Sequence, residues 1–142
     1  MIATMKKAQG VGIAANQVGV GLRVFIVAPS PNRRYPTAPR RPPVAMVNPK
    51  LLAHSRHMTL DWEGCLSIPG IRGIVPRYQW VEIDYTAPDG RRVRQRLTNF
   101  VARIFQHEFD HINGRVFLDR VQDTRTLMTD REYARQKPYA KK

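Results

Sequence analysis

The stretch NFVARIFQHEFDHING, residues 99–114, decides the fold that we predict for this chain. Apolar residues recur in it at helical spacing, a Thr or an Asn can cap its start, and an Asn-Gly pair can end it. At about 100° per residue, Phe100, Ile104, His107 and His111 fall in one narrow stripe. Because the rest of this stripe is apolar, we expect both histidines to face the interior of the protein.

The same helix carries the residues of a hydrolytic metal site. His107 and His111 lie one turn apart, so both imidazoles can bind one metal ion. A metal lowers the pKa of its bound water to roughly 7, and Glu108, about 80° further round the helix, can accept a proton from that water. The alternative is a pair of core histidines beside a chance glutamate, but such groups are costly to bury without partners.

The third metal ligand must come from outside the helix. Asp119 and Asp123 follow it, but without the helix or the spacing that zinc proteases use. His54 and His57 lie in the polar stretch AHSRHMT, and we predict that they are surface residues. Cys65, in WEGCLSIPG, is the better candidate, because a thiolate is a strong ligand for zinc or ferrous iron.

The segments before the helix are typical of strands and turns. Residues 22–28 form an apolar run that predicts a buried strand, and residues 29–43 are too rich in proline for helix or interior strand. Residues 44–49 predict a short strand that stops at a proline. Residues 79–97 predict a hairpin around PDG, in which the acids of one strand face arginines of the other. We therefore predict an α+β fold of mostly antiparallel strands packed around the central metal-binding helix.

The two ends of the chain have weaker patterns. Residues 1–9 have helical spacing, and Gly10 would end that helix as a C-terminal cap. From about Thr124 we expect a basic, partly frayed helix. The length favours a single catalytic domain over residues 1–142, with 124–142 as a basic C-terminal tail.

The composition narrows the class of protein. A formal charge of +13, from 24 basic and 11 acidic residues, favours contact with RNA, ribosomes or other polyanions, although it also serves solubility. The arginines cluster in PNRRYPTAPRRPP and RRVRQR, and the tail ends in two lysines. The single cysteine excludes an intrachain disulfide and indicates a reducing compartment. No segment has the length and apolarity of a membrane span, so we expect a cytoplasmic protein.

Three short blocks in order give the chain a family resemblance: GVGIAANQ (10–17), EGCLS (63–67) and HEFDH (107–111). The sequence resembles the peptide deformylase family through these blocks, from near Met1 to about Arg120. Members of that family usually have further strands and most of a helix before the glycine block. The resemblance therefore implies that the usual N-terminal segment is lacking here.

The resemblance implies a ligand set and a reaction. Cys65, His107 and His111 would bind one divalent metal ion, with Fe²⁺ as the expected native ion and Zn²⁺, Ni²⁺ or Co²⁺ as alternatives. Glu108 would be the general acid/base for hydrolysis of the formyl group from N-formylmethionine of nascent polypeptides by metal-bound water.

The resemblance also implies how the substrate is bound. Gln17 and the backbone N–H of Leu66 would donate hydrogen bonds to the formyl oxygen, where negative charge develops. The backbone around Val11 and Gly12 would pair with the extended peptide, although Gly10 and Gly12 also suit a plain cap and turn.

A third group of residues would surround the methionine. Phe100 and Ile104 lie on the histidine stripe and can line an apolar pocket, while Arg72 matches a family arginine near the pocket mouth. Glu63 would hold the Cys65 loop in place through hydrogen bonds without binding the metal itself. Two alternatives stay open: a zinc peptidase, which lacks its usual downstream ligand here, and a non-catalytic RNA- or ribosome-binding protein that uses the basic surface.

Overall fold

This computed structural model describes residues 1–136 of the chain. In chain order its helices, strands and short 3-10 helices (η) are α1 (Ile2–Lys7), β1 (Gly12–Ala14), η1 (Ala15–Val18), β2 (Val24–Val27), β3 (Val44–His54), β4 (Met58–Cys65), β5 (Ile68–Tyr78), β6 (Trp80–Thr86), β7 (Arg92–Thr98), α2 (Asn99–His111), η2 (Phe117–Arg120), η3 (Thr124–Thr126), β8 (Met128–Thr129) and α3 (Asp130–Gln136).

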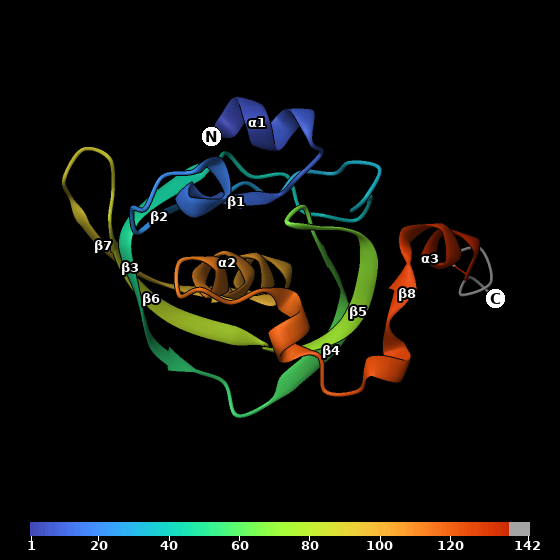
Figure 1. The fold of residues 1–142 in the computed structure, drawn as a ribbon. Coiled ribbons are helices and arrows are strands. Elements are labelled where there is room, and N and C mark those ends of the chain that lie inside the picture. Colours follow the sequence, from blue (N-terminus) through green and yellow to red (C-terminus); the bar gives the residue numbers. More distant parts are fainter. Residues whose placement is uncertain (137–142) are drawn as a thin grey trace.

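Two antiparallel sheets surround one helix. The larger sheet has the strand order β1-β2-β3-β6-β7, and the smaller one has the order β4-β5-β8. Figure 1 shows both sheets curving around α2, with α1 on the outside next to β1 and α3 beside β5. The predicted α+β fold, with mostly antiparallel strands around a central helix, is confirmed.

Helix α2 is buried on nearly every side. Its apolar side packs into the main core, where the ring of Phe105 meets that of Phe25 edge to face at 5.3 Å. The opposite side carries Arg103, Gln106 and Asp110, and these polar residues are buried as well. Each of them forms side-chain hydrogen bonds to strand β5, so their burial leaves them partnered.

Both ends of α2 are fixed by backbone groups. The helix begins at Asn99, as predicted, but the Thr98 side chain makes no capping hydrogen bond. Instead the Asn99 N–H donates to the Gln79 carbonyl at 2.8 Å, and Asn99 adopts a φ of 53°, which asparagine tolerates. The helix ends at His111, and Gly114 follows in the left-handed region that glycine favours.

Strand β3 is longer than the strand that we predicted over residues 44–49. It continues past Pro49 because the ladder with β6 is interrupted there, between Val47 and Lys50. Asn48 has a φ of 49°, which marks the irregularity. A proline at a bulge removes no ladder hydrogen bond, so it does not stop the strand.

The predicted hairpin over residues 79–97 is confirmed as β6 and β7. Glu82 lies opposite Arg96, and their side chains form an ion pair at 2.7 Å. Asp84 lies opposite Arg94 but forms its ion pair with the diagonal neighbour Arg92. This acid-to-arginine arrangement lies on the exposed face of the hairpin, where such pairs stabilise only weakly.

The two ends of the described chain differ in detail from our expectations. Helix α1 forms, but the left-handed residue after it is Gln9, with a φ of 53°, rather than Gly10. The basic helix expected from Thr124 begins only at Asp130, because a 3-10 turn and strand β8 come first, and β8 pairs with β5. The tail residues 137–142 lie outside the described part. None of the helices within residues 1–136 is long and apolar enough to cross a membrane.

Candidate active site

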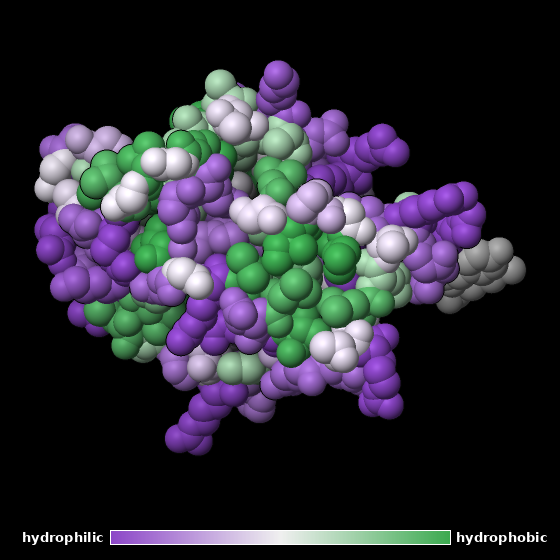
Figure 2. All heavy atoms as spheres, in the orientation of Figure 1, coloured by the Kyte–Doolittle hydropathy of each residue, from purple (hydrophilic) through white to green (hydrophobic). Residues whose placement is uncertain are grey.

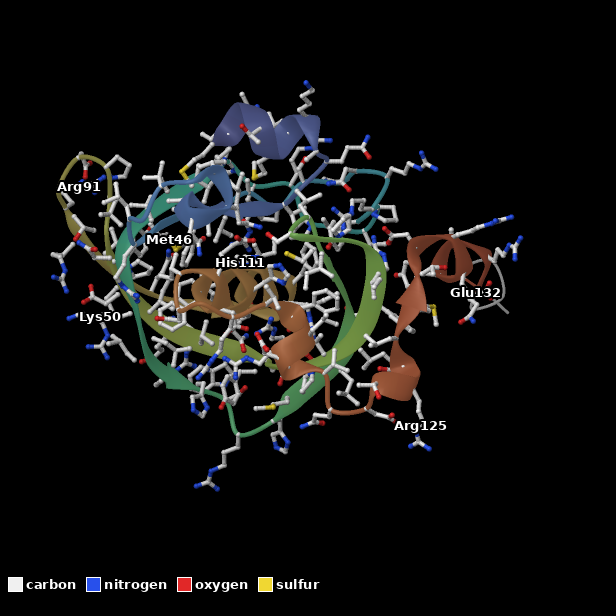
Figure 3. The ribbon with its side chains drawn as sticks, in the orientation of Figure 1. Met46, Lys50, Arg91, His111, Arg125 and Glu132 are labelled. Carbon is white, nitrogen blue, oxygen red and sulfur yellow. The ribbon has the colours of Figure 1, made fainter. Side chains whose placement is uncertain are left out.

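Strand β4 and helix α2 bring three potential metal ligands together. Cys65 is the last residue of β4, and His107 and His111 lie one turn apart on α2. One ligand atom from each of them lies within 4.8 Å of the other two, and the Cys65 Sγ is 3.2 Å from the His111 Nε2. Figure 3 shows His111 in the interior, between α2 and β1. A thiolate and two imidazoles are a ligand set suited to zinc or ferrous iron and leave a coordination position open.

The other candidate ligands are elsewhere. His54 and His57 are exposed, as predicted, and the His54 ring stacks on Tyr78. Asp119 accepts a hydrogen bond from the Val116 N–H, and Asp123 binds Arg125. Within residues 1–136, Cys65 is therefore the residue that completes the histidine pair as a group of three.

Glu63 orients one of the two imidazoles. The His107 Nδ1–H donates to the Glu63 Oε2 at 2.9 Å, which leaves Nε2 for a metal. Arg77 binds both oxygens of Glu63, at 2.9 and 3.0 Å, and Arg103 adds a third bond at 2.8 Å. Burial raises the pKa of Glu63, but Arg77 and His107 outweigh burial and hold it well below its ordinary value. Glu63 is therefore a carboxylate anion that is held in place by two arginines and hydrogen-bonded to His107.

Cys65 and His107 influence each other's protonation. Burial raises the pKa of the Cys65 thiol, but hydrogen bonds and charge from His107 and His111 outweigh it and lower the pKa to about 5. Burial lowers the pKa of His107, whereas its bonds to Cys65 and Glu63 raise it to about 10. Cys65 is therefore a thiolate at neutral pH, the form in which cysteine binds metals. A metal must displace the His107 proton, since a ligating imidazole is neutral.

Glu108 is a buried carboxyl group with a free oxygen. It is 4% exposed, and its Oε2 has no hydrogen-bond partner among the described residues. Burial raises the pKa of Glu108 to about 7, although the two imidazoles oppose that rise. Gly12 lies directly against this side chain, because a Cβ built there would be 2.8 Å from the Glu108 Cδ. A carboxyl group that titrates near neutrality can both accept and donate a proton.

Gln17 reaches the ligand cluster from η1. Its Oε1 accepts a hydrogen bond from the Ala14 N–H at 2.9 Å, which fixes the orientation of the amide. Its Nε2 donates to the Ser67 Oγ at 3.0 Å and lies 3.9 Å from the Cys65 Sγ. The neighbouring Asn16 does not enter the site, because its Nδ2 donates to the His111 carbonyl at the end of α2.

One cavity contains most of the residues singled out from the sequence. They are Val11, Gly12, Gln17, Glu63, Cys65, Leu66, Phe100, Ile104, His107 and Glu108. Val11 and Gly12 lie at the edge of the larger sheet and Cys65 at the edge of the smaller one, so the cavity opens between two sheet edges. Arg72 does not line this cavity but lies in an adjoining cleft.

The cavity also contains residues that our sequence analysis did not select. Arg103 lines it from α2. Arg34 and Tyr35 come from the proline-rich loop, and the Tyr35 ring packs on Phe100 at 5.4 Å. Their positions depend on a long loop folding back over the site, and no local pattern predicts such a contact.

The fold and the site define a metal-dependent hydrolase, in which a Cys/His/His cluster lies beside a buried carboxyl group. A family model described as polypeptide deformylase matches residues 1–126. Peptide deformylase 2 of Nostoc sp. is 56% identical over 133 residues, which cover 94% of this chain and 74% of that protein. Peptide deformylase 1 of Bordetella pertussis is 45% identical over 123 residues, which cover 87% and 70%.

Solved structures agree with these relatives. A class I type b peptide deformylase from Acinetobacter baumannii, with Met-Ala-Ser bound, superposes with a TM-score of 0.83 at 50% identity, covering 85% of this chain and 76% of that one. The enzyme from Thermotoga maritima gives a TM-score of 0.76 at 36% identity, covering 87% and 77%. This chain belongs to the peptide deformylase family, as the three sequence blocks predicted.

The family sets the reaction. The protein is a hydrolase that removes the N-formyl group from nascent polypeptides, and the Cys65, His107 and His111 cluster suits the single metal that this activity needs. This assignment replaces the two alternatives that the sequence left open, a zinc peptidase and a non-catalytic RNA-binding protein.

Proposed function

We propose that this site works as a metal-assisted deformylase, with separate residues to hold the metal, move the proton, stabilise the formyl oxygen and bind the methionine. Cys65, His107 and His111 would hold one divalent ion, which when bound supplies an acidified water and a Lewis acid for the formyl oxygen. The free Oε2 of Glu108 beside these ligands is the observation that carries the proposal. The thiolate, two imidazoles and their orientation by Glu63 fit such an ion.

Glu108 moves the proton. Its Oε2 accepts a proton from the attacking water as the water oxygen bonds to the formyl carbon. Glu108 then gives this proton to the departing amine as the carbon–nitrogen bond breaks, so the products are formate and a free N-terminus. A pKa of about 7 suits both halves of this transfer.

Gln17 and Leu66 stabilise the negative charge on the formyl oxygen. The amide of Gln17 is held by Ala14, so it is oriented before substrate arrives. The backbone N–H of Leu66, at the turn after β4, is the second donor. Each such donor is worth about 3 kcal/mol in the transition state.

The methionine side chain occupies the apolar part of the cavity. Phe100 and Ile104 line it from α2, and Val11 closes another wall. The peptide backbone lies along Val11 and Gly12 at the edge of β1, where an added strand can pair with the sheet.

The expected native metal is ferrous iron. A thiolate with two imidazoles also suits zinc, nickel or cobalt, so protein loaded with these ions would keep the same ligands. An iron-bound thiolate is open to oxidation, and we expect activity to decline in air unless the iron is replaced.

The variant Glu108→Gln tests the proposal. We expect it to keep its metal, because Glu108 is no ligand, and to lose about 10²–10⁴-fold in kcat because the proton transfer is lost. Metal analysis and formate release from a formyl-Met peptide are measured on the same anaerobic sample. A metal-loaded variant with near-normal kcat would overturn the role of Glu108.

We further propose that the protein works in the cytoplasm as one domain that contacts the ribosome through its basic surface. The charge of +13 supports this, and Figure 2 shows hydrophilic side chains projecting around the edge of one face. Arg135 lies within the described residues, whereas Lys141 and Lys142 lie outside them. Ribosome binding should weaken steeply with salt. Unchanged binding after neutralising these three residues would exclude the tail as the contact.

A further inference from the structure

A second, basic cleft adjoins the catalytic cavity. It is lined by Gln9, Arg33, Arg34, Arg72, Asp130 and Tyr133. Arg34 lines both hollows, so its side chain lies at their common rim. Three arginines face one aspartate in this cleft, which gives it a net positive charge.

Among residues 1–136, Arg72 is the one arginine of this cleft that is neutralised by a carboxylate. The Arg72 Nε donates to the Asp130 Oδ1 at 2.7 Å, and its guanidinium lies over the Tyr133 ring at 4.6 Å. No carboxylate among residues 1–136 forms an ion pair with Arg34 or Arg33. The cleft therefore has cationic groups available for an acidic ligand.

Arg34 is held in place although it lies in a long loop. The Asn32 Oδ1 accepts hydrogen bonds from the N–H groups of Arg34 and Tyr35, at 2.8 and 2.9 Å. The Tyr35 ring is in turn anchored on Phe100. An Arg34 guanidinium nitrogen lies only 3.4 Å from the position that a Cβ at Gly64 would occupy, next to the ligand Cys65. The positive charge is thus positioned beside the reaction centre.

The backbone of residues 9–12 connects the catalytic residues to the cleft. Gly12 lies against Glu108, Gly10 and Val11 line the catalytic cavity, and Gln9 lines the basic cleft. A peptide extended along this segment advances about 3.3 Å per residue. If formylmethionine lies at Gly12, the second and third residues of the substrate lie level with Val11 and Gly10, next to the cleft that Gln9 and Arg34 line.

We propose that Arg34, with Arg33, selects nascent chains that carry an aspartate or glutamate as their second or third residue. This inference rests on the proposed placement of formylmethionine in the cavity. A guanidinium binds a carboxylate through two parallel hydrogen bonds, and partial burial at the rim screens the pair less than open solvent does. Arg72 does not take this role, because Asp130 already occupies its guanidinium.

The experiment compares kcat/KM for four peptides: formyl-Met-Ala-Ser, formyl-Met-Asp-Ser, formyl-Met-Ala-Asp and formyl-Met-Lys-Ser. In low salt, the wild-type protein should favour the better acidic peptide over formyl-Met-Ala-Ser by about three- to tenfold. Arg34→Gln should bring this ratio close to one, and Arg34→Glu should shift the preference to the lysine peptide. Arg34→Lys should keep part of the acidic preference.

Arg40→Gln is the matched control, since Arg40 is exposed in the same loop and lines neither hollow. It should retain the wild-type ratio. Binding constants for the products Met-Asp-Ser and Met-Ala-Ser, measured on metal-loaded protein, report the same preference without turnover. A wild-type ratio near one, or a ratio that Arg34→Glu leaves unchanged, would overturn the inference. A normal rate for Glu108→Gln with the Arg34 effects intact would instead overturn only the catalytic assignment.

Discussion

At the scale of single residues, the site needs a glycine at position 12 because the Glu108 carboxyl group lies directly against it. The space next to Glu108 is closed by the backbone at Gly12, and no side chain fits there. The free Oε2 of Glu108 thus stays buried but unblocked. The sequence motif predicts a proton-transfer role for Glu108, but the reason for the glycine appears only when β1 and α2 are packed together.

Gly12→Ala should impair catalysis without removing the metal ligands. The new methyl group would push the Glu108 side chain away, and a displacement on the order of 1 Å costs about 100-fold in rate. Gly21→Ala is the control, because a Cβ at Gly21 meets nothing within 4 Å. Assays of kcat/KM on both variants check this, and equal rates for the two would contradict the account.

From the sequence alone, candidate site residues could be named where a short spacing indicates a role. The one-turn spacing of His107 and His111, with Glu108 between them, predicted a metal site on the helix. Cys65 was predicted as the third ligand because its thiolate binds zinc or ferrous iron strongly. Arg34 was not found, because it reaches the site through the fold of a loop rather than through a local period.

At the scale of elements, the polar side of α2 is joined to strand β5 by buried ion pairs of Asp110 with Arg77 and Arg120, a cluster that we call the clamp. Asp110 accepts hydrogen bonds from Arg77 of β5 and from Arg120 of η2. Arg77 also donates a hydrogen bond to Glu63, the carboxylate that orients His107. The clamp therefore fixes the helix and the ligand-orienting carboxylate together.

Asp110→Asn should destabilise the protein by about 2–4 kcal/mol, since it leaves two guanidinium groups without the carboxylate that paired them. Asp84→Asn on the hairpin makes the same chemical change at an exposed pair and should cost below about 1 kcal/mol. Urea unfolding of metal-loaded protein compares them. Similar midpoints for the two variants would show that the clamp contributes little.

Element boundaries were predicted less well than element types. Strand β3 passes Pro49 because a bulge accommodates the proline, and bulges depend on the partner strand. The segment after Thr124 was expected as one helix, but β8 forms first because β5 offers it an edge. In both places a contact distant in sequence overrides the local pattern.

At the scale of the whole molecule, two sheet edges and one helix enclose the site, and several basic side chains extend into solvent. Figure 3 shows Lys50, Arg91 and Arg125 extending away from the interior that holds His111. The fold class followed from helical and alternating periods in the sequence. The way in which the sheets wrap α2, and the cleft that adjoins the cavity, required the structure.

The central claim is that these residues form a working deformylase with one metal ion. The most direct measurement is formate release from formyl-Met-Ala-Ser by anaerobically purified protein, with metal content determined on the same sample. We predict one divalent ion per chain and a kcat of about 1–10³ s⁻¹, the usual range for enzymes. Protein that holds one metal ion per chain at this site but releases no formate would contradict the account.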